Sequence, residues 1–158
     1  MATNIFFKSA EHKQRFLTVM QQTGKIYSGK LDPEYGAALY ILTADLDIWQ
    51  EVSGYVSRRG MDIEAILEEV DLSGGYSVLV MLAGNLFNSQ THLDAIELMR
   101  LDDSNFTVAL TALQVRRASL PVSELASEAE LYNLEMDARN RITVENRDKP
   151  WLPLHDGE

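Results

Sequence analysis

The chain has 158 residues, of which 46% are hydrophobic and 24% are charged, a composition typical of folded globular proteins. This length allows one domain with a single hydrophobic core. The absence of cysteine excludes disulfides, a thiolate nucleophile and cysteine-bound metal sites, and it favours a reducing cytoplasm. The formal net charge of −10 makes direct binding to nucleic acid unlikely, because phosphates carry the same sign.

Secretion and membrane insertion are also disfavoured. Charged side chains at Lys8, Glu11 and Lys13 interrupt the first stretch of the chain, which argues against a signal peptide. The longest strongly apolar stretch, VLVMLAGNLF at 78–87, is far shorter than the ~20 residues that a membrane-spanning helix needs. We therefore expect a soluble, cytoplasmic protein with no membrane partner.

One pattern recurs along the chain and predicts helices: a small polar residue, then apolar residues at helical spacing, then a glycine, an asparagine or a basic residue. The first helix is expected over 9–24, with Ser9 as its N-cap and Gly24 at its end. The second is expected to start at Asp32 as N-cap with Pro33 in the first helical position. A third is expected over 45–60, capped by Asp45 or Asp47 and ending at the pair Arg58-Arg59 and Gly60.

The next three segments continue the pattern. Asp62 is expected to cap a helix that reaches Asp71. The segment 73–90 is ambiguous, because Tyr76 to Met81 is rich in residues that favour strands, but leucines at helical spacing predict a buried helix. A short helix is expected over 91–101.

The stretch LDDSNF at 101–106 could hold a metal ion or start a helix. With Asp102 as N-cap, Leu101 and Phe106 occupy the two positions of a hydrophobic staple, which favours the helix start. The apolar residues that follow predict a helix central to the core. It ends at Arg116-Arg117, where cations offset the helix dipole, so we do not interpret either arginine pair as a nucleic-acid site.

After Ser119 the chain becomes acidic, with nine acidic and four basic side chains in 119–158. Ser123 is a candidate N-cap for a further helix. These patterns predict an all-α fold, a compact single-domain bundle of about six or seven helices. We expect residues 5–118 to form the helical core domain, 119–142 an acidic amphipathic helix and 143–158 a flexible tail.

No pattern indicates a catalytic residue, a metal site or a cofactor. His12, His92 and His155 are far apart in the sequence, and none has a partner at metal-ligand spacing. Three groups of acidic residues could hold divalent ions if they lay on facing helices, namely Asp45/Asp47, Glu68/Glu69/Asp71 and Asp102/Asp103. Roles as helix caps or as solvated surface residues explain these groups equally well.

Two asparagines interrupt the apolar stretch LAGNLFN at 82–88. A buried amide without partners costs ~1–3 kcal/mol, so Asn85 is expected to brace a neighbouring helix end or loop, with a ligand contact as the alternative. Asn88 is expected to be a left-handed C-cap. We group both with Asp102 as structural polar residues.

Four stretches together resemble a known family: SAEHKQRF at 9–16, AALYILTA at 37–44, LAGNLFN at 82–88 and LDDSNFTVALTALQVRR at 101–117. Their order and spacing are similar to those of small bacterial and phage proteins classed as a domain of unknown function. The resemblance covers residues 5–118 and carries over no functional residue. It implies a phage or mobile-element context, in which small acidic helical proteins often bind other proteins.

The sequence therefore favours a non-enzymatic protein-interaction or regulatory module, of which a phage-borne inhibitor of a host defence protein is one form. The alternative is a small carboxylate-based metal-dependent enzyme. The expected partner is a protein with a basic surface, attracted by the acidic chain, and a homo-oligomer is also compatible with the sequence. The candidate partner-binding residues are Trp49, Tyr55, Trp151, Leu152 and Leu154.

Overall fold

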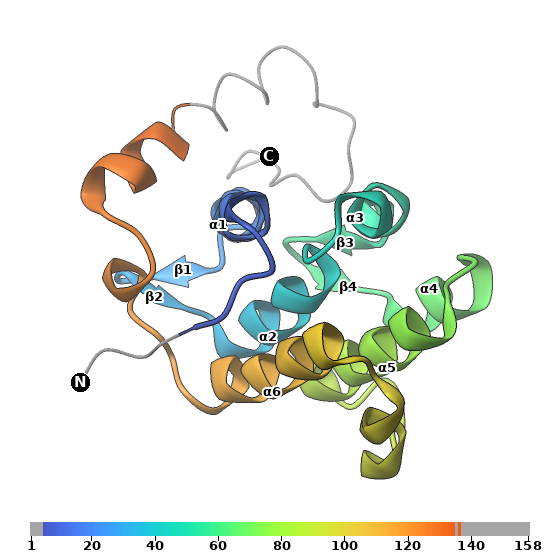
Figure 1. Cartoon of the computed structure of the whole chain (residues 1–158). Helices are drawn as coiled ribbons and strands as arrows, with labels where there is room; N and C mark the ends of the chain where they lie inside the picture. Colours follow the sequence, from blue (N-terminus) through green and yellow to red (C-terminus); the bar gives the residue numbers. More distant parts are fainter. Residues whose placement is uncertain (1–4, 135, 137–158) are drawn as a thin grey trace.

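The computed structural model describes residues 5–134 and 136, and this part of the chain is mostly helical (Figure 1). The predicted all-α class is confirmed. The α-helices are α1 (Ala10–Gln22), α2 (Pro33–Leu42), α3 (Leu46–Val52), α4 (Ile63–Glu69), α5 (Gly74–Asn88) and α6 (Asp103–Arg117). Three 3-10 helices join them, η1 (Ser53–Tyr55), η2 (Ala95–Arg100) and η3 (Val122–Glu124), and residues 128–134 are also helical. None of the helices in the described residues combines the length and apolar character that crossing a bilayer requires.

Side-chain N-caps fix where these α-helices begin. In each, an oxygen of the capping residue accepts a hydrogen bond from a backbone N–H two or three residues later, which satisfies a donor that the helix leaves open. The predicted caps Ser9, Asp32, Asp62 and Asp102 are confirmed. Of the two candidates for α3, Asp45 is the cap and Asp47 is not, and Ser73 has the same role in α5.

Two β-hairpins were not expected from the sequence. The first pairs β1 (Ile26–Tyr27) with β2 (Lys30–Leu31), and the second pairs β3 (Val56–Ser57) with β4 (Gly60–Met61). The prediction of one helix up to Gly60 is therefore wrong, because α3 ends at Val52 and Arg58-Arg59 form the tip of the second hairpin.

The two hairpins share one local design. In the first, the Asp32 N–H donates to the Lys25 carbonyl over 2.9 Å, and in the second the Asp62 N–H donates to the Tyr55 carbonyl over 3.0 Å. In both, the aspartate that closes the hairpin is also the N-cap of the next helix. The fold therefore contains the same hairpin-to-helix unit twice, at 25–42 and 55–69.

Helix α2 lies at the centre of the molecule. Figure 1 shows α1 on one side of it and α5 and α6 on the other, and these are the helices that contact it most. Every residue of α2 from Tyr35 to Leu42 is buried. Helix α4 packs against α5, and α3 packs beside α2, so that the single core extends across all of these helices.

Buried side chains of the core continue past residue 118, the predicted end of the core domain. The Leu31 N–H donates to the Leu120 carbonyl over 2.8 Å, and the Val122 N–H donates to the Gly29 carbonyl over 2.7 Å. The side chains of Leu120, Val122 and Leu125 are buried in the same core. The segment after α6 is thus tied to the first hairpin by its backbone and its side chains.

The helix that follows begins later than expected. Its N-cap is Ser127, whose Oγ accepts a hydrogen bond from the Glu130 N–H over 3.1 Å, and not Ser123, which lies in η3. Residues 135 and 137–142 of the predicted helix, and the whole of the predicted tail at 143–158, lie outside the described residues.

Candidate functional site

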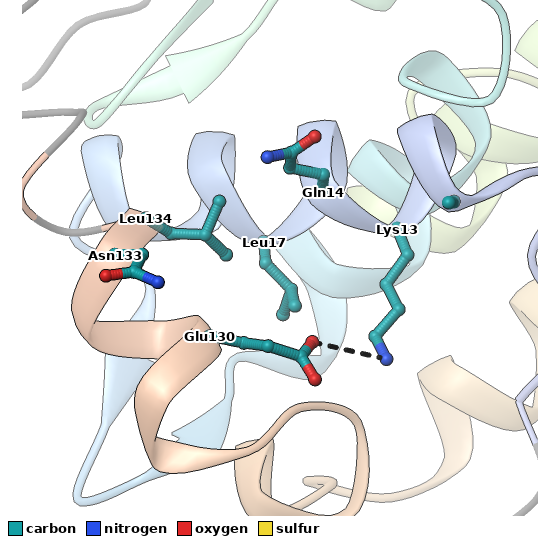
Figure 2. Close-up of a pocket in the computed structure, with 7 residues that line it drawn as sticks. Lys13, Gln14, Leu17, Glu130, Asn133 and Leu134 are labelled. Carbon is teal, nitrogen blue, oxygen red and sulfur yellow. Dashed lines mark ion pairs between the residues drawn. The ribbon is translucent and has the colours of Figure 1, made fainter.

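A groove separates α1 from the helical residues 128–134 (Figure 2). Its volume is about 320 Å³, within the range of ~300–1,000 Å³ that ligand pockets occupy. One wall comes from the first three turns of α1 and the other from the C-terminal helical segment. The groove is lined by Ala10, Lys13, Gln14, Leu17, Glu130, Asn133 and Leu134.

Local sequence explains why these side chains share a groove. On α1 the residues that line it are spaced three or four apart, so they form one face of the helix. On the other wall, the Ser127 cap sets the start of the helix and thereby the direction of Glu130 and Leu134. The Ser127 hydroxyl also donates to Glu130 Oε1 over 3.4 Å, which holds that carboxylate near the helix start.

The groove is apolar in its middle and polar at its rim. Leu17 and Leu134, with 1% and 6% of their surface exposed, form the apolar part. Lys13 Nζ lies 3.7 Å from Glu130 Oε2 across the two walls, and both side chains are partly exposed, at 33% and 56%. An exposed pair at this distance contributes at most about 1 kcal/mol, so a ligand can replace either partner at low cost.

A second polar cluster joins the N-terminal segment to three helix starts. Lys8 Nζ lies 3.3 Å from both the Tyr76 hydroxyl and Asn105 Oδ1, and the Tyr76 hydroxyl donates to Asp45 Oδ2 over 3.2 Å. Burial, followed by the charge of Asp45, raises the pKa of Tyr76 to about 12, so the phenol keeps its proton and remains a donor. Each of the four side chains has a hydrogen-bond partner within the cluster, which makes it a structural tie.

His12 is also accounted for by structure. It is fully buried, its Nδ1 accepts from the Lys8 N–H over 3.1 Å, and its Nε2 lies 2.8 Å from the Tyr40 carbonyl. Its ring packs against those of Phe7 and Tyr40. Both ring nitrogens are used within the core, so His12 is not available to a substrate in this conformation.

The acidic groups considered as metal ligands are separated in the structure. Asp45 and Asp102 serve as caps of different helices. His92 Nε2 lies 3.1 Å from Asp94 Oδ1, a contact that two residues so spaced in a regular α-helix would not make. Both side chains are mostly exposed. Within the described residues, no three histidines or carboxylates come together in a geometry that could hold a metal ion.

The candidate partner-binding residues lie in different environments. Trp49 is 6% exposed and belongs to the core, which argues against its use as a surface anchor. Tyr55 is half-buried on η1, and its hydroxyl donates to Glu69 Oε1 over 2.7 Å. Trp151, Leu152 and Leu154 lie outside the described residues.

The three structural polar residues are partly as expected. Asp102 is the N-cap of α6 and accepts from the Asn105 N–H over 2.8 Å. Asn85 does brace a loop, donating to the Thr91 carbonyl over 3.0 Å, but it is exposed and not buried. Asn88 is the last residue of α5, and the left-handed C-cap is its neighbour Ser89, at φ 61°.

Sequence reasoning did not identify the groove residues. The pattern Ser127 to Glu130 is a capping-box signature that could have located the helix start. No local signal could have paired Lys13 with Glu130, because the two are 117 positions apart. Comparisons of the chain with protein-family models, curated proteins and solved structures give no match.

Proposed function

We propose that this protein is a non-enzymatic binding protein whose partner is another protein. The observation that carries the proposal is the groove between α1 and residues 128–134, which offers an apolar middle with hydrogen-bonding groups at its rim. Such a surface suits docking of a side chain or short segment. Elsewhere in the described residues, Lys8, Tyr76 and Asp45 tie segments together, and Asp102 caps a helix.

The charge of the chain supports a partner with a basic surface. A net charge of −10 attracts such a surface over a distance of about one Debye length, ~8 Å at physiological ionic strength. We extend the proposal to regulation of the partner. The family resemblance implies a phage or mobile-element context, in which a protein that binds a host defence protein can inhibit it.

Affinity capture from bacterial lysate tests this function. The tagged protein should retain a specific partner at low salt, and raising the salt to ~0.15 M should weaken capture because it screens the attraction between the charges. The control is the double variant Glu64→Gln/Glu68→Gln, which reduces the negative charge on α4. Because α4 lies far from the groove in Figure 1, this variant should still capture the partner. Turnover of a small-molecule or nucleic-acid substrate by the purified protein alone would contradict the proposal.

A further inference from the structure

We infer that the groove between α1 and residues 128–134 receives a peptide segment of the partner in which an apolar side chain lies next to a basic one. This inference rests on the proposed function and specifies its site and its ligand. It follows from the shape of the groove, its hydrogen-bonding groups and its charge.

The size of the groove and its apolar middle favour binding of an apolar side chain of the partner. A volume of about 320 Å³ is small for a pocket, so it suits one or two side chains of a larger partner. Leu17 and Leu134 approach it from opposite walls, and Ala10 adds a small side chain at the start of α1 (Figure 2). Burying a Leu-sized side chain between them removes the apolar surface of that incoming side chain from water.

The rim selects a peptide backbone. Gln14 on α1 and Asn133 on the facing helix are both exposed and both line the groove. Each side-chain amide carries two donors and one acceptor oxygen, which matches the N–H and C=O of a peptide group. A peptide lying along the groove can therefore form hydrogen bonds with both walls while its apolar side chain points inward.

The negative charge of the wall formed by residues 128–134 favours a basic residue next to the apolar one in the bound peptide. Residues 119–134 contain Glu124, Glu128 and Glu130 and no lysine or arginine. The only cation that lines the groove among the described residues is Lys13, which already lies 3.7 Å from Glu130. A lysine or arginine of the partner can share Glu130 in a charge-assisted hydrogen bond, whereas an acidic peptide meets like charge.

Nuclear magnetic resonance of the full chain with labelled leucine methyl groups tests the inference. The probe is the capped peptide acetyl-Lys-Leu-Lys-amide, compared with acetyl-Lys-Ser-Lys-amide and acetyl-Glu-Leu-Glu-amide. The Lys-Leu-Lys peptide should shift the Leu17 and Leu134 methyl resonances saturably at millimolar concentrations. The other two peptides should bind at least tenfold more weakly, because one lacks the apolar side chain and the other has the opposite charge.

Two matched pairs of variants locate the binding. Glu130→Gln should weaken the peptide several-fold, whereas Glu128→Gln, the same change on the same helix but not lining the groove, should not. Gln14→Trp should fill the groove and abolish binding, whereas Gln114→Trp on the exposed side of α6 should not. Equal melting temperatures within each pair show that folding is not the cause.

Several results would overturn the inference. These are no methyl shift with any peptide, shifts confined to leucines outside the groove, or equal binding of the Glu-Leu-Glu peptide. A peptide RDKPWLPL, the sequence of 147–154, is added to the series; if it alone binds, the occupant is the chain itself and not a partner. A lysate partner retained equally by wild type and Gln14→Trp would leave the proposed function standing and remove the groove from it.

Discussion

His12 holds the N-terminal segment to the core through both nitrogens of its ring. Because the Lys8 N–H donates to Nδ1, the ring proton sits on Nε2 and is donated to the Tyr40 carbonyl. Burial lowers the pKa of His12 to about 4; the hydrogen bond to the Tyr40 carbonyl acts in the opposite direction, and the charges of Arg15 and Lys8 lower the pKa further. The neutral ring is thus part of the folded structure.

This geometry predicts a pH dependence of stability. The unfolded chain takes up a proton on His12 near pH 6.5, whereas the folded chain does so only near pH 4. The contribution is therefore fully present above pH 6.5 and is lost as the pH falls from 6.5 to 4. Because a tenfold difference in proton affinity corresponds to about 1.4 kcal/mol, His12 should account for about 3 kcal/mol of this loss, measured by urea unfolding at each pH.

Two variants separate His12 from the carboxylates that also titrate in this range. His12→Gln should be less stable than wild type at pH 7, and the difference should shrink as the pH approaches 4. His92→Gln, at a mostly exposed position, should follow the wild-type curve. If the unfolding free energies of wild type and His12→Gln stay parallel from pH 7 to 4, protonation of His12 is not coupled to unfolding.

At the scale of elements, α5 is fixed by a close approach at Gly84. A Cβ atom added there would lie 2.6 Å from Thr91 Oγ1 and 3.0 Å from Ile63 Cγ2. Thr91 cannot easily retreat, because its hydroxyl donates to the Met81 carbonyl and its own carbonyl accepts from Asn85. One glycine thus allows α5, the loop after it and the start of α4 to meet.

Replacing Gly84 should therefore cost stability. Gly84→Ala forces overlap in a packed region, and we expect it to lower the unfolding free energy by about 1–3 kcal/mol in urea titrations. The matched substitution in the same helix is Gly75→Ala, where the nearest atom to the new Cβ is 3.6 Å away. That change should stabilise the protein by about 0.5–1 kcal/mol, because alanine favours the helix. Equal effects of the two substitutions would show that the approach at Gly84 is not tight.

At the scale of the whole molecule, the features that the sequence predicted are those set by near neighbours. Asp32 and Asp102 were identified as caps because a cap bonds to a backbone N–H only three residues away. The two hairpins were missed because strands of two residues show no alternation, and Arg58-Arg59 resembled the basic end of a helix. Asn85 was misplaced because the apolar run around it did not reveal which face of α5 lies on the surface.

The candidate site was less predictable than the fold. Both of its walls were expected to be helical, at 9–24 and within 119–142. Their packing depends on the segment between Ala118 and Ser127, whose contacts with Gly29 and Leu31 join residues about 90 positions apart. Such pairings are decided by the shape of the assembled core, which local patterns of charge and hydrophobicity do not encode.

That segment also decides how much of the chain is needed to fold. Leu120, Val122 and Leu125 are 6%, 4% and 7% exposed, and each side chain of this size contributes about 1.5–3 kcal/mol when buried. A chain ending at Ala118 should therefore lose several kcal/mol and unfold at a much lower temperature, whereas a chain ending at Met136 should unfold cooperatively near the wild-type temperature. Circular dichroism during thermal unfolding measures both. Full cooperativity in the shorter chain would restore the boundary at residue 118 and show that residues 119–134 pack on a core that is already complete.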